Sequence, residues 1–279
     1  MQTERASRKV IAAVADDAAA SVVLSVATAV ADLYAATAQA VHVGEEHAAL
    51  AAAAQDAGVA LRTVAGPPVE SLARAAAAED VAALVIGARG GPADRRPVGS
   101  TALQLITVLQ KPVVVVPPAV ASGRRIERLL VPLDGTTASA AALHETVRFA
   151  RNADAEITVA HVQRRHSAPP FENHLPHEVD AWSEEFIARY CPSATDATLE
   201  LRAEDGKPHE HVLDILRRSD CDLVALGWSQ DLARGRAAVV RRMLAESPVP
   251  VLLAPASNHH EFGVPAAALA ADSADCERA

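Results

Sequence analysis

Residues 87–101 read GARGGPADRRPVGST and follow the apolar run VAALVI (81–86) without a break. Glycines let main-chain N–H groups approach an anion with no Cβ in the way. We expect Ser100 to cap a helix through TALQLITVLQ, whose N-terminus would offer unpaired N–H donors and a partial positive charge. The segment therefore predicts a loop that binds phosphate.

Three arginines, Arg89, Arg95 and Arg96, add formal positive charge to this loop. The alternative is an ordinary glycine turn of an α/β protein, with a serine at a helix start and solvated arginines. The position after a strand favours binding, because ligands of open α/β sheets lie beyond the carboxyl ends of the strands.

Asp16 and Asp17 end the first predicted strand and are a second place for chemistry. A carboxylate there could accept a hydrogen bond from a ribose hydroxyl or lie near adenine. Either residue could instead be a helix N-cap, a position that aspartate favours.

Other motifs indicate no catalytic or metal site. The chain lacks both a GxxxxGK[ST] loop and a GxSxG elbow, so neither of those routes to catalysis is available. His209 and His211 are two positions apart and point to different helix faces, and His174 and His177 lack a third ligand. We interpret all four histidines as solvated surface.

The amino-acid composition limits the binding partners and the cellular compartment that we expect for this chain. A formal net charge of -9, a pI near 5.6 and 3% aromatic residues argue against nucleic-acid binding. The three cysteines show no CxxC spacing, which disfavours disulfides and structural zinc and favours the cytoplasm. Acidic residues interrupt the apolar N-terminal stretch, so we expect neither an export signal nor a membrane span.

Apolar runs alternate with helical stretches along the first half. We predict strands at 9–15, 39–43, 59–66, 81–87 and 112–118, helices at 18–36 and 67–80, and a further helix before the last strand. Strands alternating with helices imply a parallel sheet with helices on both faces.

The same order recurs in the second half. Gly66 and Gly87 are 21 positions apart, and so are Gly206 and Gly227. We predict strands within 128–135, 156–162, 199–206, 221–227 and 248–255, with helices over 138–153 and 207–220. Each copy is large enough to be a domain.

The prediction is therefore two tandem open α/β domains, each with a five-stranded parallel sheet. Their limits are 9–120 and 121–256, with an N-terminal tail at 1–8 and a mobile tail at 257–279. The second copy also carries an insertion at 163–196.

At this point the chain resembles a tandem universal stress protein. The resemblance lies in VPLDGT (131–136), its weaker partner AAVADD (12–17), the HV pairs ending at Val43 and Val162, and the glycine loop. Nucleotide-binding members have Gly, two residues, Gly, nine residues, Gly, then Ser or Thr. Here eight residues separate Gly90 from Gly99, and Gly91 could absorb the difference.

The resemblance implies that the first domain binds ATP, alone or with Mg²⁺, or a related adenine nucleotide, as a stress-response sensor with at most weak ATP hydrolysis. The implied site residues are Ala15, Asp16, Asp17, Val43, Gly87, Arg89, Gly90, Gly91, Arg95, Arg96, Gly99, Ser100 and Thr101. It also implies that the fifth strands of the two halves pair antiparallel, and leaves a homodimer open. The rivals are an interaction protein with a relic loop and a slow ATPase or nucleotidyl-transfer enzyme.

The second loop, GWSQDLARGRAAVVRRML, keeps Gly227 but has Gln230 in place of the second glycine. Ala237 and Ala238 stand where the first loop has its Gly-Ser pair, and Trp228 is expected to crowd the mouth. We therefore expect no ATP in the second domain.

Overall fold

The computed structural model describes residues 8–15, 18–45, 47–89, 98–120, 125–133, 142, 146, 150, 153–163, 198–203, 208–230 and 238–255. The elements of the first half are β1 (Lys9–Val14), α1 (Ala20–Leu33), β2 (Thr37–Val43), α2 (Ala48–Asp56), β3 (Ala60–Val64), α3 (Pro68–Ala77), β4 (Val81–Gly87), α4 (Ser100–Val108) and β5 (Val113–Val116).

The elements of the second half repeat this order as far as they are described. They are β6 (Arg128–Leu133), β7 (Glu156–Gln163), β8 (Thr198–Ala203), α7 (Pro208–Arg218), β9 (Leu223–Trp228), α8 (Ala238–Glu246) and β10 (Val251–Pro255). Of the helix predicted over 138–153, only positions 142, 146, 150 and 153 are described, and all four are helical.

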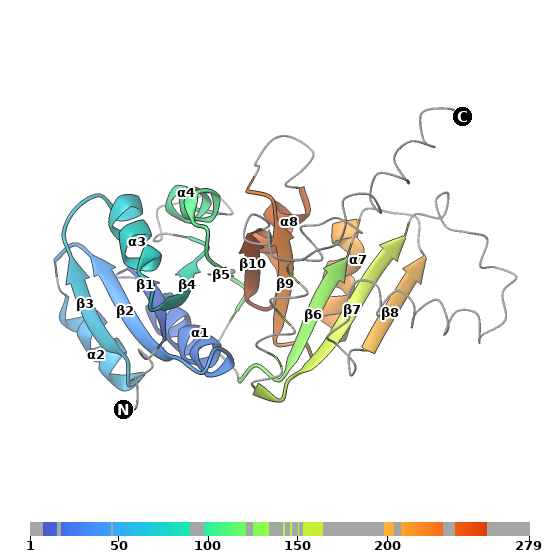
Figure 1. Cartoon of the computed structure of the whole chain (residues 1–279), viewed down its shortest axis with the longest axis horizontal. Coiled ribbons are helices and arrows are strands. Elements are labelled where there is room, and N and C mark those ends of the chain that lie inside the picture. The colour runs from blue at the N-terminus through green and yellow to red at the C-terminus, as the bar shows by residue number, and fades with distance from the viewer. Residues whose placement is uncertain are drawn as a thin grey trace, which may run out of the picture.

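All described strands form one ten-stranded sheet, in the order β3-β2-β1-β4-β5-β10-β9-β6-β7-β8 (Figure 1). Neighbouring strands are parallel within each half. The exception is the pair β5 and β10, which is antiparallel with Val113 opposite Leu253 and Val115 opposite Val251. The expected pairing of the fifth strands is therefore confirmed, and it joins the two halves of one chain.

Two apolar layers cover the two faces of this sheet. Val10, Ala12 and Val14 of β1 pack with α1 and α2 on one face. Ile11 and Ala13 face the other way, in the layer that contains residues of α3, α4, α7 and α8. Both faces of the central strands are therefore buried, as in an α/β fold with helices on both sides.

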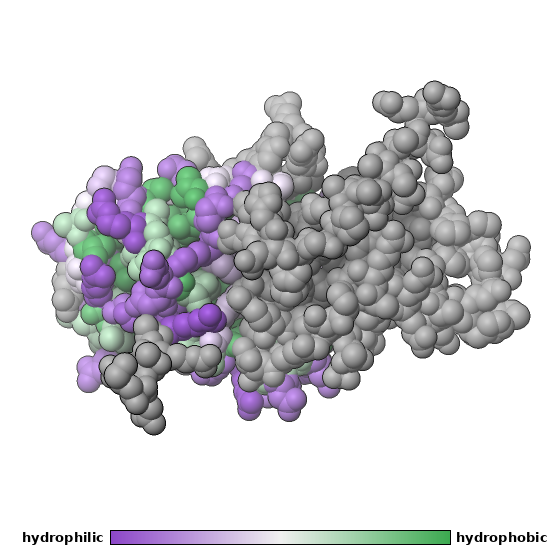
Figure 2. Space-filling model, viewed as in Figure 1, coloured by the Kyte–Doolittle hydropathy of each residue, from purple (hydrophilic) through white to green (hydrophobic). Residues whose placement is uncertain are grey.

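Hydrophilic and hydrophobic side chains of the first half are interspersed over the face in view in Figure 2. Among the described residues, Val108 at the end of α4 is the exposed large apolar side chain, at 54% of its surface. The other large apolar side chains of the described residues are therefore buried or half-buried.

The strand predictions agree with the structure to within a few residues, whereas two helices are shorter than expected. The helix predicted over 18–36 spans Ala20–Leu33, and the one over 67–80 spans Pro68–Ala77. Helix α2 was not predicted.

Candidate functional site

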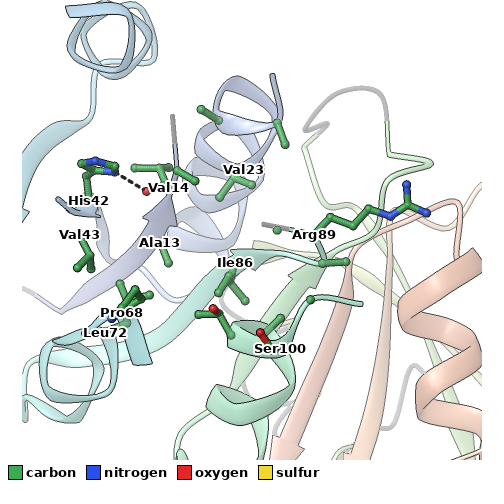
Figure 3. Close-up of a pocket in the computed structure, with 18 residues that line it drawn as sticks. Ala13, Val14, Val23, His42, Val43, Pro68, Leu72, Ile86, Arg89 and Ser100 are labelled. Carbon is green, nitrogen blue, oxygen red and sulfur yellow. Dashed lines mark hydrogen bonds between the residues drawn. The ribbon is translucent and has the colours of Figure 1, made fainter. Parts of the chain in front are cut away.

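A cavity of about 300 Å³ opens at the carboxyl ends of β1, β2 and β4 (Figure 3). The chain runs from β1 outward through β2 and β3, then crosses back to place β4 on the other side of β1. The cavity therefore lies where the strand order reverses, the usual position of a ligand in an open α/β sheet.

Apolar side chains form most of the cavity wall. Ala13 and Val14 come from the end of β1, Val43 from the end of β2, Ile86 from β4, and Leu72 from α3. The β1 and β4 residues are buried because these strands lie inside the sheet. This wall can accommodate a flat apolar group.

His42 is a polar residue of the cavity wall, and it is fixed in place. Its Nδ1 lies 3.0 Å from the main-chain oxygen of Val14, and the ring is 7% exposed (Figure 3). Because a carbonyl oxygen can only accept, the ring donates from Nδ1. Gly44 leaves room for it: a Cβ there would lie 3.2 Å from His42 Nε2, and the φ of Gly44 is +136°.

The N-terminus of α4 forms the opposite side of the cavity, where Gly99, Ser100, Thr101 and Ala102 line it. Gly99 is the N-cap, and its N–H donates to the oxygen of Ala88 at 2.7 Å. The N–H groups of Ser100, Thr101 and Ala102 occupy the first turn, where an α-helix provides no acceptor for them. This end of the cavity is therefore suited to an anion.

One expectation about this loop is wrong. Ser100 does not cap the helix: it is the first helical residue, and the N-cap position makes no side-chain hydrogen bond. The backbone conformations of Gly99, with a φ of -69° and a ψ of 154°, and of Gly87, which has no positive φ, are ones that any residue adopts. Main-chain N–H groups remain the feature of this site that could hold phosphate.

Arg89 follows β4 and borders the cavity, but its side chain is exposed. In Figure 3 it extends away from Ser100 and Val14. The structure thus directs main-chain donors, rather than the Arg89 guanidinium, toward the cavity.

The structure brings together the predicted site residues Ala15, Val43, Gly87, Arg89, Gly99, Ser100 and Thr101 around the cavity. The other predicted residues lie outside the described ranges; they are Asp16, Asp17, Gly90, Gly91, Arg95 and Arg96.

Sequence reasoning missed His42 as a lining residue. The HV pair at 42–43 recurs at 161–162, at the end of the second strand of each half. That repetition could have indicated the histidine, but a single histidine beside a valine carried no chemistry of its own.

Trp228 does not crowd the mouth of the second loop, which corrects another expectation. Its indole is 2% exposed, and its Nε1–H donates to the oxygen of Ile106 in α4 at 2.8 Å. The side chain therefore points into the contact between the halves.

Among the described residues, no three histidine, cysteine or acidic side chains lie together in a cluster able to hold a metal ion. Within the same ranges, no helix has both the length and the apolar character that crossing a membrane requires.

Comparisons with known proteins agree with the repeat. The model of the universal stress protein family matches residues 2–117 and 125–255. The universal stress protein Rv2319c of Mycobacterium tuberculosis is 33% identical over 129 residues, covering 41% of this chain and 43% of that protein. The chain thus spans less than half the length of this curated relative.

Solved structures extend the likeness to most of the chain. A universal stress protein from Archaeoglobus fulgidus aligns with a TM-score of 0.62 at 15% identity, covering 89% of this chain and 98% of that one. A functionally unknown protein from Pseudomonas aeruginosa PAO1 aligns with a TM-score of 0.58 at 15% identity, covering 89% and 92%. At these identities the likeness establishes the fold.

Proposed function

This chain belongs to the universal stress protein family, and we propose that its first half binds ATP or a related adenine nucleotide as a sensor or regulatory module. The supporting observation is that one cavity combines an apolar wall with the N-terminus of α4. These two surfaces complement the two chemically different ends of a nucleotide.

The adenosine end would lie against the apolar wall, between Val14, Val43 and Leu72. Main-chain groups of Ala15 and Val43 would contact the base or ribose, and Asp16 or Asp17 would accept from a ribose hydroxyl. His42 supports this end, because its hydrogen bond to Val14 ties the ends of β1 and β2 together.

The phosphates would lie at the first turn of α4, against the N–H groups of Ser100, Thr101 and Ala102. Helix N-termini favour anions through these donors and the helix dipole. Gly90 and Gly91 would complete the cradle, and Arg89, Arg95 and Arg96 would supply screened charge around it. The cavity volume of about 300 Å³ is at the small end of the ~300–1,000 Å³ typical of ligand sites.

We propose a single nucleotide site in a chain of two domains, 9–120 and 121–256. In the second half Gln230 stands where the first loop has Gly90, and α8 begins at Ala238 where α4 begins at Ser100. The proposed setting is the cytoplasm, and Mg²⁺ would accompany ATP through its phosphates.

The enzyme alternative needs a general base or metal-binding carboxylates near the loop. Asp94 is the carboxylate within that loop, and Asp16 and Asp17 follow β1. Efficient hydrolysis of added ATP would favour this alternative over a sensor.

Mass spectrometry of small molecules released from purified, denatured protein tests the proposal. Adenine nucleotide in about equimolar amount supports it, and ATP that stays intact in a timed assay supports the sensor role. Protein that is empty as purified and does not bind added ATP would leave the relic-loop alternative.

A further inference from the structure

The second half contacts the C-terminal end of α4, the helix whose N-terminus lines the cavity. Trp228 follows Gly227 at the end of β9, and its indole N–H donates to the oxygen of Ile106 at 2.8 Å. The indole is buried in the apolar layer that also contains Leu105 and Ile106. A residue of one half thus satisfies a carbonyl of a helix in the other.

Gln230 makes a second contact with the same end of α4. Its Nε2 donates to the oxygen of Leu109 at 2.6 Å, and its Oε1 accepts from Gln110 Nε2 at 3.0 Å. The φ of Gln230 is +59°, a left-handed conformation that residues with a Cβ seldom adopt. Its side chain thus contacts the C-cap residue of α4 and the residue after it.

These contacts provide hydrogen-bond donors for carbonyl groups at the C-terminal end of α4. The last carbonyls of an α-helix have no partner within it, and partners from outside stabilise that end. Helix α4 has nine residues and is about 14 Å long at the usual rise per residue. In so short a helix, contacts that fix the C-terminal end also restrain the position of the N-terminal end.

The internal repeat adds a second observation. Gly227 corresponds to Gly87, so Trp228 corresponds to Ala88 and Gln230 to Gly90. In the first half Gly87 and Ala88 line the cavity, whereas in the second half the side chains of Trp228 and Gln230 contact a helix of the other half.

We propose that Trp228 and Gln230 are positioning residues for the first-half cavity: they hold α4 by its C-terminal end and so set the place of its N-terminal donors. Nucleotide binding is then coupled to the second half, and the coupling is reciprocal. The ligand part of this inference rests on the proposed nucleotide site, whereas the part on α4 stands on the contacts alone.

The test compares two variants with a matched control. Trp228→Phe keeps an aromatic ring but removes the donor to Ile106. Gln230→Gly removes the amide contacts and leaves Trp228 in place, so it tests the second contact separately. Glycine also adopts the left-handed backbone without strain, so this variant should fold. Ser229→Ala lies between them at an exposed position and serves as the control.

The first measurement is hydrogen exchange of the full chain without ligand. Amides of α4 should exchange faster in Trp228→Phe and Gln230→Gly than in the parent and in Ser229→Ala, while amides of α1 stay unchanged. Unchanged exchange in α4 would overturn the proposal, and faster exchange throughout the first half would show a general loss of stability instead of positioning.

The second measurement is calorimetric titration with ATP. Each variant should bind ATP about threefold more weakly than Ser229→Ala, the size expected for part of one hydrogen bond. The chain has two tryptophans, Trp182 and Trp228. When Trp182 is replaced by phenylalanine, the fluorescence comes from Trp228, and ATP should change its emission. Equal affinities, or faster α4 exchange with no effect on binding, would overturn the coupling.

Failure of the proposed function is recognised separately. If the parent itself binds no ATP, the nucleotide site is wrong and the coupling fails with it. The exchange of α4 then still decides whether Trp228 and Gln230 hold this helix.

Discussion

The Nδ1 atom of His42 lies 3.0 Å from the carbonyl oxygen of Val14, and the two residues are also register partners in β2 and β1. A side chain of one strand thus binds the main chain of its neighbour where both strands reach the cavity. This hydrogen bond holds together the strand ends that form the apolar wall, against which we place the adenosine.

Replacing His42 by alanine should lower both stability and ligand affinity. The buried carbonyl of Val14 would lose its donor, which costs about 1–3 kcal/mol when a buried polar group is left unpaired. Urea unfolding followed by circular dichroism measures the first effect, and calorimetric titration with ATP measures the second.

His42→Gln provides the comparison, because the glutamine amide retains a donor. It should recover part of the stability and part of the affinity lost in His42→Ala. Equal affinity for ATP in the alanine variant and the parent would show that binding at the apolar wall does not depend on this hydrogen bond.

Gly99→Val should abolish ATP binding and leave the fold intact. The φ of -69° and ψ of 154° at Gly99 are open to valine, but its branched side chain would stand at the first turn of α4, where we place the phosphates. Calorimetry measures binding, and circular dichroism checks the fold.

Arg89→Ala should reduce affinity by only about three- to fivefold, and less at high salt, because an exposed charge is screened by solvent ions. The same is expected for Arg95→Ala and Arg96→Ala. If Gly99→Val binds like the parent while an arginine variant does not, the loop holds its ligand through arginines and our account of α4 is wrong.

A titration of the whole chain with ATP should give one site per chain. The second loop has Gln230 in place of a glycine, and its Trp228 is committed to the oxygen of Ile106. Two equal sites, measured by calorimetry against an independently determined protein concentration, would contradict the proposed difference between the halves.

Asp80→Asn should destabilise the protein at neutral pH and have less effect in acid. Lys9 Nζ lies 2.7 Å from Asp80 Oδ2, and this hydrogen bond is the main cause that lowers the pKa of the Asp80 carboxyl. A lowered pKa gives stability above the carboxyl's ordinary range, which is lost as the pH falls through the lowered value.

Urea unfolding at several pH values between neutral and acid measures this dependence. The gap between the parent and Asp80→Asn should close on the acid side, whereas Asp56→Asn at the exposed end of α2 serves as the control. A gap that stays constant across the series would mean that the ion pair does not contribute.

Strands such as β4 and β5 could be predicted because they are short apolar runs, and β5 is buried at all four positions. Helix α2 could not, because its sequence AALAAAAQD buries only Leu50 and Ala54 and its N-cap His47 makes no side-chain capping bond. Local sequence therefore marks an element well only where packing imposes a clear pattern.

The candidate site was predicted in part. The strands that end at the cavity and the helix that begins there could be predicted from the internal repeat and from the glycine loop. The roles of His42 and Trp228 depend on partners 28 and 122 positions away in the chain, which no local pattern reveals. Ser100 looked like a cap by residue type, but the backbone places the cap one residue earlier.

The pairing of β5 with β10 also bears on how such a protein can evolve. In a symmetric pair of identical chains, every substitution appears in both copies, so the two loops cannot change separately. Here the two fifth strands belong to one chain, and a substitution at position 230 alters one loop alone. Because the two halves are covalently linked, their sequences can diverge, and one half can acquire a new function while the other keeps its cavity.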